Sequence, residues 1–258
     1  MVKLLFRFLA RHISREYLIS FYPAFKPILT VSYKGNKFCC PICERSFRKF
    51  LPWGTKGQDN RLCPNCLSLE RHRLLWLYLK NKTDFFTAKL KVLHVAPATP
   101  FVKRFKAMKN IDYTTADLFS RKVDVRLNIE KIPCSNNSFD VIICNHVLEH
   151  VEKERQAISE LFRILKKGGW AILQVPINIK RKETLESVGV LAPQKKESYF
   201  GQRDHLRIHG LDYPQILEEM GFSVYPQDYF QELGDEPIRY YRLPKKRIIY
   251  LNKKGKDK

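Results

Sequence analysis

The sequence predicts an α/β fold: a mostly parallel sheet with helices on both faces, preceded by a small cysteine-rich ribbon. From residue 89 onward, apolar runs alternate with amphipathic stretches, which is the pattern of parallel strands connected by helices. Two Cys-x-x-Cys pairs precede that region. With 258 residues, 44% of them hydrophobic, the chain is long enough for one large core and one small one. The predicted parts are a basic N-terminal segment (1–36), a ribbon with its following helix (37–80) and a large domain (89–258).

The N-terminal residues 1–22 are apolar, but a basic residue interrupts them at every fourth position: Lys3, Arg7, Arg11 and Arg15. On a helix this spacing gathers the four charges along one side. Such a helix either packs on its own domain or lies on an anionic membrane surface. The charges also argue against a secretory signal. We therefore expect a cytoplasmic protein, with peripheral contact to the inner membrane face through residues 1–22 as an alternative.

Four of the seven cysteines form two pairs, Cys40 with Cys43 and Cys63 with Cys66, and 19 residues separate the pairs. Two such turns supply four thiolates for one tetrahedral ion, and the spacing is typical of a structural zinc site. We predict Zn²⁺ here, with iron as the alternative ion. Aromatic and basic side chains surround the pairs: Phe47, Phe50, Trp53, Arg45, Arg48, Lys49, Lys56, Arg61, Arg71 and Arg73. They either bind RNA through phosphates and bases, or the aromatics fill the ribbon's core and the charges are solvated.

The large domain begins after a predicted helix over 67–80. Its predicted strands cover 91–95, 139–145, 170–175, 222–225 and 247–251. A helix follows the cap and first-turn proline at Thr99 and Pro100, and a short helix begins at Asp212. A further helix carries Ile158, Leu161, Phe162 and Leu165 at helical spacing, and we expect it to end at Gly168 and Gly169.

In open sheets of this kind, ligands bind beyond the carboxyl ends of the strands, where the strand order reverses. That rule gathers Ala96–Thr99, Asp117, Asn128 and Asn145–His146 around one crevice. Asp117 follows the first strand's turn by about 20 residues, where dinucleotide-binding folds place an acid on ribose hydroxyls. Its alternative role is that of a turn or cap residue.

Three blocks of the chain, 115–118, 138–150 and 160–176, resemble the class I S-adenosylmethionine-dependent methyltransferases. Two further stretches, 61–72 and 204–207, resemble a subgroup that carries an N-terminal four-cysteine zinc ribbon. The resemblance implies a Rossmann-like class I methyltransferase fold and S-adenosylmethionine as cofactor. It also implies cofactor contacts from six residues: Ala96, Pro97, Asp117, Asn128, Ile129 and Asn145.

The chain departs from the family at its cofactor loop. The usual glycine-rich loop is absent, and Ala98 stands where the subgroup has glutamate. Asn128 stands where an acid is usual, and Asn136 and Asn137 replace a usual acidic pair. Asparagine still accepts hydrogen bonds, but lost carboxylates remove favourable interactions with a cationic sulfonium. A non-catalytic binding protein of this fold is therefore one alternative.

The predicted function is transfer of a methyl group to an anionic small molecule or glycan. His146 directly follows a strand end and is the candidate general base, with capping or packing as its alternative role. The net charge of +21 favours anionic partners. The long connection 178–210 predicts a basic lid; its charges are Lys180, Arg181, Lys182, Arg203, His205, Arg207 and His209.

The second predicted function is that of an RNA methyltransferase that uses the ribbon to bind RNA. Asn145 is followed by His146 and Val147, so the chain lacks the Asn-Pro-Pro-Tyr type of motif that amino-group base methyltransferases use. That difference disfavours the RNA alternative without removing it. The sequence predicts no oligomeric state.

Overall fold

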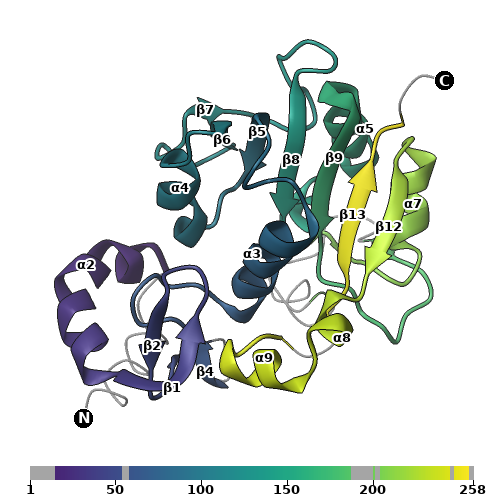
Figure 1. Cartoon of the computed structure of the whole chain (residues 1–258). Helices are drawn as coiled ribbons and strands as arrows, with labels where there is room; N and C mark the ends of the chain where they lie inside the picture. The colour runs from purple at the N-terminus through teal and green to yellow at the C-terminus, as the bar shows by residue number, and fades with distance from the viewer. Residues whose placement is uncertain (1–14, 54–57, 187–199, 201–203, 245–246, 256–258) are drawn as a thin grey trace. The chain divides into compact units, whose positions relative to one another are not determined.

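The computed structural model describes residues 15–53, 58–186, 200, 204–244 and 247–255 (Figure 1). They form two compact units. The cysteine-rich unit comprises the described residues of Met1–Asp84, Ala98–Arg104 and Asp228–Arg247. The sheet unit comprises those of Phe85–Pro97, Phe105–Gln227 and Ile248–Lys258. The domain boundaries predicted at residues 36, 80 and 89 stay predictions, and the sequence pattern did not indicate that residues 228–247 join the cysteine-rich unit.

The cysteine-rich unit is built from short strands and helices. Its elements are α2 (Arg15–Ser32), β1 (Lys34–Cys40), β2 (Arg45–Phe47), β3 (Leu51–Trp53), β4 (Gln58–Leu62), α3 (Glu70–Lys82), α8 (Tyr229–Leu233) and α9 (Asp235–Tyr240). Strand β1 pairs antiparallel with β2, and β3 with β4. Phe47 and Phe50 are buried with ring centroids 5.8 Å apart. Of the two roles open to these aromatics, the structure therefore supports that of core residues.

Arg73 of α3 is fully buried in this unit. Its guanidinium donates hydrogen bonds to four backbone carbonyls, those of Arg61, Ser68, Tyr241 and Arg242, at 2.7 to 3.1 Å. Burial lowers its pKa from the ordinary value. Arg73 therefore joins three stretches of backbone and is unavailable to a nucleic acid. The expectation that Arg73 is an exposed basic side chain of the ribbon is wrong.

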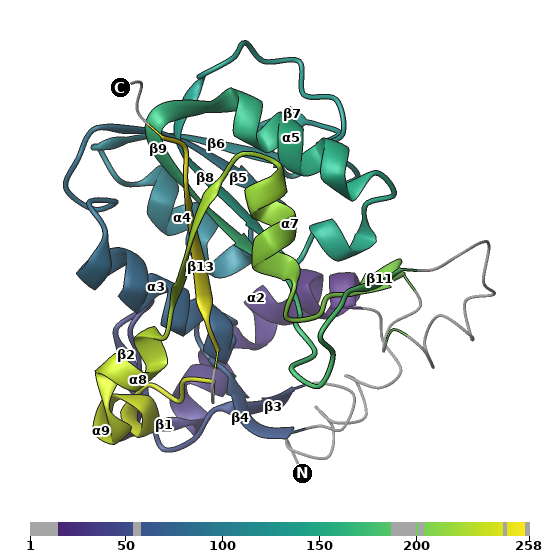
Figure 2. The same ribbon diagram turned by 90° about the vertical axis from the view of Figure 1, so that its right-hand side faces the viewer.

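The sheet unit contains a seven-stranded sheet in the order β12-β13-β9-β8-β5-β6-β7 (Figures 1 and 2). Its elements are β5 (Leu90–Val95), β6 (Ile111–Asp117), β7 (Val125–Arg126), β8 (Phe139–Asn145), η1 (Leu148–His150), α5 (Glu154–Ile164), β9 (Leu165–Gln174), β10 (Leu185–Glu186), β11 (Arg207–Ile208), α7 (Tyr213–Glu219), β12 (Ser223–Gln227) and β13 (Ile249–Lys253), and it shares α4 (Thr99–Lys106) with the cysteine-rich unit. Within the seven-stranded sheet, strand β13 runs antiparallel to β9 and β12, and the other pairs are parallel. Strands β10 and β11 form a separate antiparallel pair. The predicted mostly parallel, Rossmann-like sheet is confirmed.

Helices α5 and α7 lie on one side of this sheet (Figure 2). Their buried side chains, among them Ile158 and Leu217, pack in one cluster with sheet residues such as Ile142 and Leu173. Alternation along β5 sends His94 to the opposite side, where it contacts the rings of Phe105 and Tyr113. Both sides of the sheet are therefore covered, as the continuous apolar strands predicted.

Helix α5 ends earlier than predicted. It stops at Ile164, and Leu165 is already extended, because Leu165 pairs with Phe139 of β8. The expected stop at Gly168 and Gly169 is therefore wrong, and both glycines lie within β9. A Cβ atom on Gly169 would lie 2.7 Å from the backbone oxygen of Asp140, so the close approach of β8 and β9 requires glycine there.

Candidate active site and cysteine cluster

The strand order reverses at β5, whose two neighbours are β6 and β8. Val95 is in register with Ala116 of β6 and with Cys144 of β8. The three residues that follow, Ala96, Asp117 and Asn145, therefore stand at one carboxyl edge of the sheet. Ala96 has a left-handed φ of 45°, and its N–H donates to the carbonyl of Ala116 at 2.7 Å. Residue Pro97 continues this turn and is half-buried.

Asp117 ends β6 and caps a turn. Its Oδ1 accepts hydrogen bonds from the N–H groups of Phe119 and Ser120, both at 2.8 Å. This is the turn role that the sequence left open. Oδ2 has no hydrogen-bond partner within the described parts of the chain, so the same carboxylate retains one acceptor for a ligand.

Asn128 and Ile129 lie close in sequence to a contact with the end of β6. The N–H of the preceding residue, Leu127, donates to the carbonyl of Asp117 at 3.0 Å. The Asn128 side chain is exposed, and its Oδ1 accepts from the N–H of Glu130 at 2.9 Å. The Ile129 side chain is buried in the core of the sheet unit. Any cofactor contact from Ile129 must therefore come from its backbone, and the roles of both residues stay predictions.

Asn145 and His146 end β8 next to a buried carboxylate. His146 has a left-handed φ of 60°, and its N–H donates to the carbonyl of Gln174 at 2.7 Å. Its Nδ1 lies 3.3 Å from Oε1 of Glu149, whose side chain is 2% exposed. The side-chain oxygen of Asn145 is buried and, among the described residues, has no hydrogen-bond partner. The strand end therefore presents one unpaired acceptor beside a histidine–carboxylate pair.

The Glu149 carboxyl has a lowered pKa. Burial alone would raise it, but the hydrogen bond and charge of His146 outweigh burial, with a smaller contribution from the charge of His150. An ionised Glu149 accepts the Nδ1–H of His146 whether that ring is charged or neutral, and in the neutral ring the lone pair therefore lies on Nε2. His146 is thus oriented as a general base must be.

The predicted basic lid is wrong for three of its seven residues, His205, Arg207 and His209, which are all buried. Arg207 donates to the carbonyls of Leu148 and Val151, both at 2.6 Å. His209 lies 2.6 Å from a carboxylate oxygen of Glu154. The side chains of Arg207 and His209 therefore hold neighbouring segments of the chain together and are not available to an anionic substrate. Lys180 and Lys182 are exposed and Arg181 is half-buried, whereas Arg203 lies outside the described residues.

The four cysteines Cys40, Cys43, Cys63 and Cys66 form one cluster, with all four Sγ atoms within 4.8 Å of one another. The Sγ atoms of Cys40 and Cys66 are 3.6 Å apart, and those of Cys43 and Cys63 are 3.7 Å apart. Four sulfurs held about 2.3 Å from one zinc ion at tetrahedral corners lie about 3.8 Å apart. The cluster therefore has the dimensions of a tetrahedral thiolate site.

The two cysteine turns have the same backbone geometry. The residue after each second cysteine, Glu44 and Leu67, has a left-handed φ of 55° and 59° respectively. The N–H groups of these residues donate to the carbonyls of Cys40 and Cys63 at 2.7 and 3.1 Å. The sequence analysis did not identify Ser68, which is fully buried and whose Oγ lies 3.2 Å from Sγ of Cys40.

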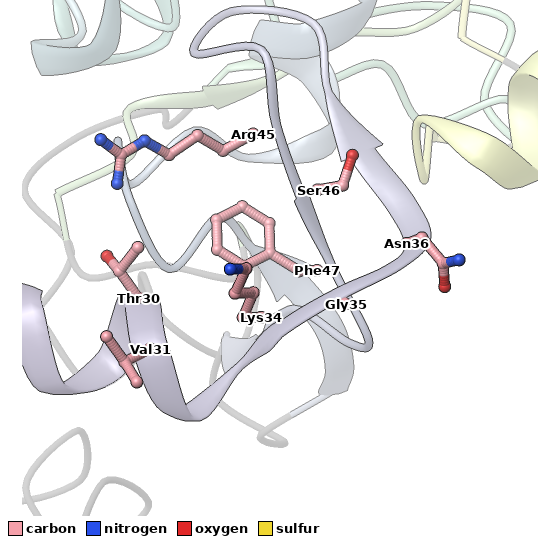
Figure 3. A pocket seen from close by; sticks show the side chains of 8 residues that line it. All are labelled: Thr30, Val31, Lys34, Gly35, Asn36, Arg45, Ser46 and Phe47. Atoms are coloured by element: carbon pink, nitrogen blue, oxygen red, sulfur yellow. The ribbon is translucent and has the colours of Figure 1, made fainter.

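A hollow lies in the cysteine-rich unit, between the end of α2 and strands β1 and β2 (Figure 3). Its lining residues are Thr30, Val31, Lys34, Gly35, Asn36, Arg45, Ser46 and Phe47. The view centres on the Phe47 ring, with Lys34 beside it and Arg45 extending past it. The hollow shares no residue with the sheet edge described above.

Part of the large domain is similar to known proteins. The family described as "Methyltransferase domain" matches residues 82–173. The chain is 26% identical over 130 residues to the ubiquinone/menaquinone biosynthesis C-methyltransferase UbiE of Pasteurella multocida, which covers 46% of this chain and 44% of that protein. It is also 26% identical over 141 residues to a ubiquinone biosynthesis O-methyltransferase of Rickettsia akari, covering 53% of this chain and 49% of that protein. The chain thus spans about half the length of these relatives.

Solved structures agree on the fold. The cyclase SpnF superposes with a TM-score of 0.52 at 16% sequence identity, covering 92% of this chain and 96% of SpnF. Identity this low shows a shared fold alone, and a cyclase on this fold shows that the fold does not define the reaction. The match over residues 82–173 and the order of the seven-stranded sheet together show that this region has the Rossmann-like methyltransferase fold.

Proposed function

We propose that this chain is an S-adenosylmethionine-dependent methyltransferase that acts on an anionic small molecule or glycan and carries a structural zinc ion. The observation that carries the proposal is the buried side-chain oxygen of Asn145, which has no hydrogen-bond partner in the described part of the chain and lies where the strand order reverses. A buried acceptor without a donor is costly unless a ligand supplies one. The ammonium group of S-adenosylmethionine is such a donor, and Oδ2 of Asp117 suits the ribose hydroxyls.

The cofactor, when bound, supplies an electrophilic methyl group on its sulfonium. The chain's own residues hold the cofactor, align the acceptor and move a proton. His146 is the proposed base: Glu149 holds its Nδ1–H, and Nε2 accepts the proton of an acceptor hydroxyl. His146→Asn should lower the turnover rate about 100-fold or more while S-adenosylmethionine binding stays unchanged. An equal loss of binding and turnover would instead assign His146 a structural role.

The zinc proposal is supported by the sulfur spacing and by the two matching turns. The cluster has no open ligand position once four thiolates bind one ion, which is typical of a structural site. Four sulfur ligands also suit iron, so metal analysis of purified protein distinguishes the two ions. One zinc per chain supports the proposal, whereas one iron per chain would mean that the four cysteines bind iron.

The acceptor is proposed to be anionic because of the net charge and the exposed Lys180 and Lys182. The test uses S-adenosylmethionine with a labelled methyl group and fractionated cell extract. Label in the small-molecule or glycan fraction, absent with Asp117→Ala, supports the proposal. Label that ribonuclease releases would favour the RNA alternative. No label from a protein that binds the cofactor would favour the non-catalytic alternative.

One observation favours RNA as the second candidate acceptor. Lys34 and Arg45 both line the hollow in Figure 3, and Arg45, Arg48 and Lys49 are exposed. Basic side chains around a hollow can hold phosphates. RNA binding that weakens steeply with salt, and weakens further with Arg45→Gln and Lys34→Gln, would support this candidate. Unchanged RNA binding in both variants would remove it.

Peripheral membrane contact is also proposed, although residues 1–14 lie outside the described residues. Its support is the exposed apolar stripe of α2, formed by Phe25, Ile28 and Val31 at three-residue spacing. None of the described helices is long and apolar enough to cross a membrane. Replacing the stripe with serines is a sharper test than deleting residues 1–22, because Tyr22 donates a hydrogen bond to the carbonyl of Pro64 between two of the cysteines. The measurement is sedimentation of the protein with anionic vesicles. If the triple serine variant sediments as the unmodified chain does, this proposal is wrong.

A further inference from the structure

The sheet unit contains a second cluster of metal-binding side chains, formed by Glu149, His150 and His205. The ligand atoms of these three residues lie within 4.8 Å of one another. Glu149 and His150 belong to η1, next to the end of β8, and His205 comes from a stretch 55 residues further along the chain. The cluster shares no residue with the four cysteines.

Both histidines are already oriented for a metal ion. Nδ1 of His150 donates to the backbone carbonyl of Asp204 at 3.2 Å, and Nδ1 of His205 donates to that of Phe200 at 3.2 Å. A carbonyl oxygen only accepts, so each Nδ1 carries the proton and each Nε2 keeps its lone pair. Metal-binding histidines in proteins are held in this way by a carbonyl or carboxylate on the second ring nitrogen.

The carboxylate supplies an independent observation. Glu149 is 1% exposed, and its Oε2 is buried without a hydrogen-bond partner among the described residues. Oε1 is 3.3 Å from Nδ1 of His146 and 4.0 Å from Nε2 of His150. A buried, unpaired carboxylate oxygen is costly, and a cation is the ligand that satisfies it most fully.

The backbone holds the cluster together from both sides. The N–H of Leu206 donates to the carbonyl of Glu149 at 2.9 Å, and Arg207 donates to the carbonyl of Leu148 at 2.6 Å. These bonds fix the stretch around His205 against η1. The rings of His150 and His205 consequently meet edge to face, with centroids 4.8 Å apart. The site is therefore largely formed before any ion binds.

We propose that Glu149, His150 and His205 bind a divalent transition-metal ion at the carboxyl end of β8. Two imidazoles and one carboxylate suit Mn²⁺, Fe²⁺, Co²⁺ or Zn²⁺, whereas Mg²⁺ and Ca²⁺ prefer oxygen ligands. Ligand atoms held about 2.1 Å from one ion lie about 3.0 to 4.2 Å apart, so separations within 4.8 Å close by at most about 1.8 Å on binding. Three protein ligands leave coordination positions open.

The open positions indicate the acceptor class. Asn145 and His146 directly precede η1, so an ion on Glu149 lies beside the proposed base. An ion there would bind an oxygen of the acceptor, from a carboxylate or a hydroxyl, and would lower the pKa of a bound hydroxyl. This part of the inference rests on the proposed methyltransferase function, whereas the metal site itself does not.

The test is a titration with Mn²⁺, followed by electron paramagnetic resonance of the free ion, on protein that holds one zinc per chain, the amount that fills the four thiolates and leaves this cluster empty. Oxygen and nitrogen ligands bind Mn²⁺, and the four thiolates suit softer ions, so the signal reports this cluster. We expect one Mn²⁺ per chain. Glu149→Gln and His150→Gln should each weaken binding at least tenfold. His150 is about one-third exposed, so its variant is expected to fold even if the Glu149 variant does not.

The matched control is Glu152→Gln, which removes the same charge from an exposed position three residues further on. It should bind Mn²⁺ as the unmodified chain does. No Mn²⁺ binding by folded protein, or equal binding by His150→Gln, would overturn the site. S-adenosylmethionine binding, measured without Mn²⁺ on the same samples, reports separately on the proposed function. If the protein binds the cofactor but not Mn²⁺, the metal-site proposal is wrong and the methyltransferase proposal stands. If it binds Mn²⁺ but not the cofactor, the methyltransferase proposal is wrong and the metal site stands.

Discussion

Single buried polar residues set several properties of this molecule, and His94 is the clearest case. Its ring is 2% exposed within β5 and bonds through Nδ1 to the hydroxyl of Tyr113 at 2.8 Å. Burial lowers its pKa from 6.5 to about 3. Between these values the unfolded chain binds a proton that the folded chain does not, so stability falls as the pH falls below 6.5.

We predict that His94→Gln reduces this acid sensitivity, because glutamine does not titrate in the range. Between pH 6.5 and pH 5 the unmodified chain should lose about 2 kcal/mol of unfolding free energy more than the variant does. Urea unfolding of both proteins at the two pH values measures the difference. The comparison cancels any acid effect on the cysteine cluster, since both proteins contain it. Parallel pH dependences would show that folding does not lower the pKa of His94.

Arg73 provides a second prediction at this scale. Lysine cannot reach all four carbonyls that the guanidinium of Arg73 satisfies, so Arg73→Lys leaves buried acceptors unpaired. The variant should lose at least about 3 kcal/mol of unfolding free energy. The control is Arg48→Lys, an exposed residue whose change should cost less than about 1 kcal/mol. Thermal and urea unfolding measure both, and equal losses would contradict the account.

At the scale of elements, the cysteine turns should depend on their metal. A tight chelator should remove one zinc per chain and make the cysteine-rich unit sensitive to protease, because metal binding and folding are coupled. Cys63→Ser should have the same effect. Cys39→Ser is the matched control, since Cys39 adjoins Cys40 but lies outside the cluster. Full protease resistance after complete metal removal would show that the cluster is not needed for folding.

The β8–β9 pair gives the second element-scale prediction. Gly169→Ala places a Cβ atom 2.7 Å from the Asp140 backbone oxygen, so the strands must separate locally. We expect a loss of about 1 to 3 kcal/mol in unfolding free energy. Gly255→Ala meets nothing within 4 Å and serves as the control. Unchanged stability in both variants would mean that the strands adjust freely at this point.

Strands buried on both faces were predictable from the sequence, because their apolar runs are continuous. Phe139–Asn145 was predicted with its observed bounds, and β5 within one residue. The end of α5 was not predictable from local signals. Leu165 favours a helix by spacing, but pairing with Phe139 draws it into β9, and that pairing is a tertiary contact.

For the whole molecule, the sheet edge was predicted well and the Glu149–His150–His205 cluster was not. Topology brings Ala96, Asp117 and Asn145 to one edge. The strands that precede Ala96 and Asn145 were predicted from their apolar runs, whereas β6, which ends at Asp117, was not among the predicted strands. The pairing of His205 with His150 depends on backbone bonds across 55 residues. The only sequence signal was the stretch 204–207, whose basic residues suggested a lid because burial cannot be read from composition.

The central claim is that the carboxyl edge around Asp117 and Asn145 binds S-adenosylmethionine. Titration calorimetry on purified, zinc-loaded protein tests it most directly, with Asp117→Ala as the site variant. Asp112→Ala is the control, since Asp112 is an exposed acid at the other end of the same strand. We expect binding in the micromolar range that Asp117→Ala abolishes and Asp112→Ala leaves unchanged. No binding by folded, zinc-loaded protein, or equal binding by all three proteins, would contradict it.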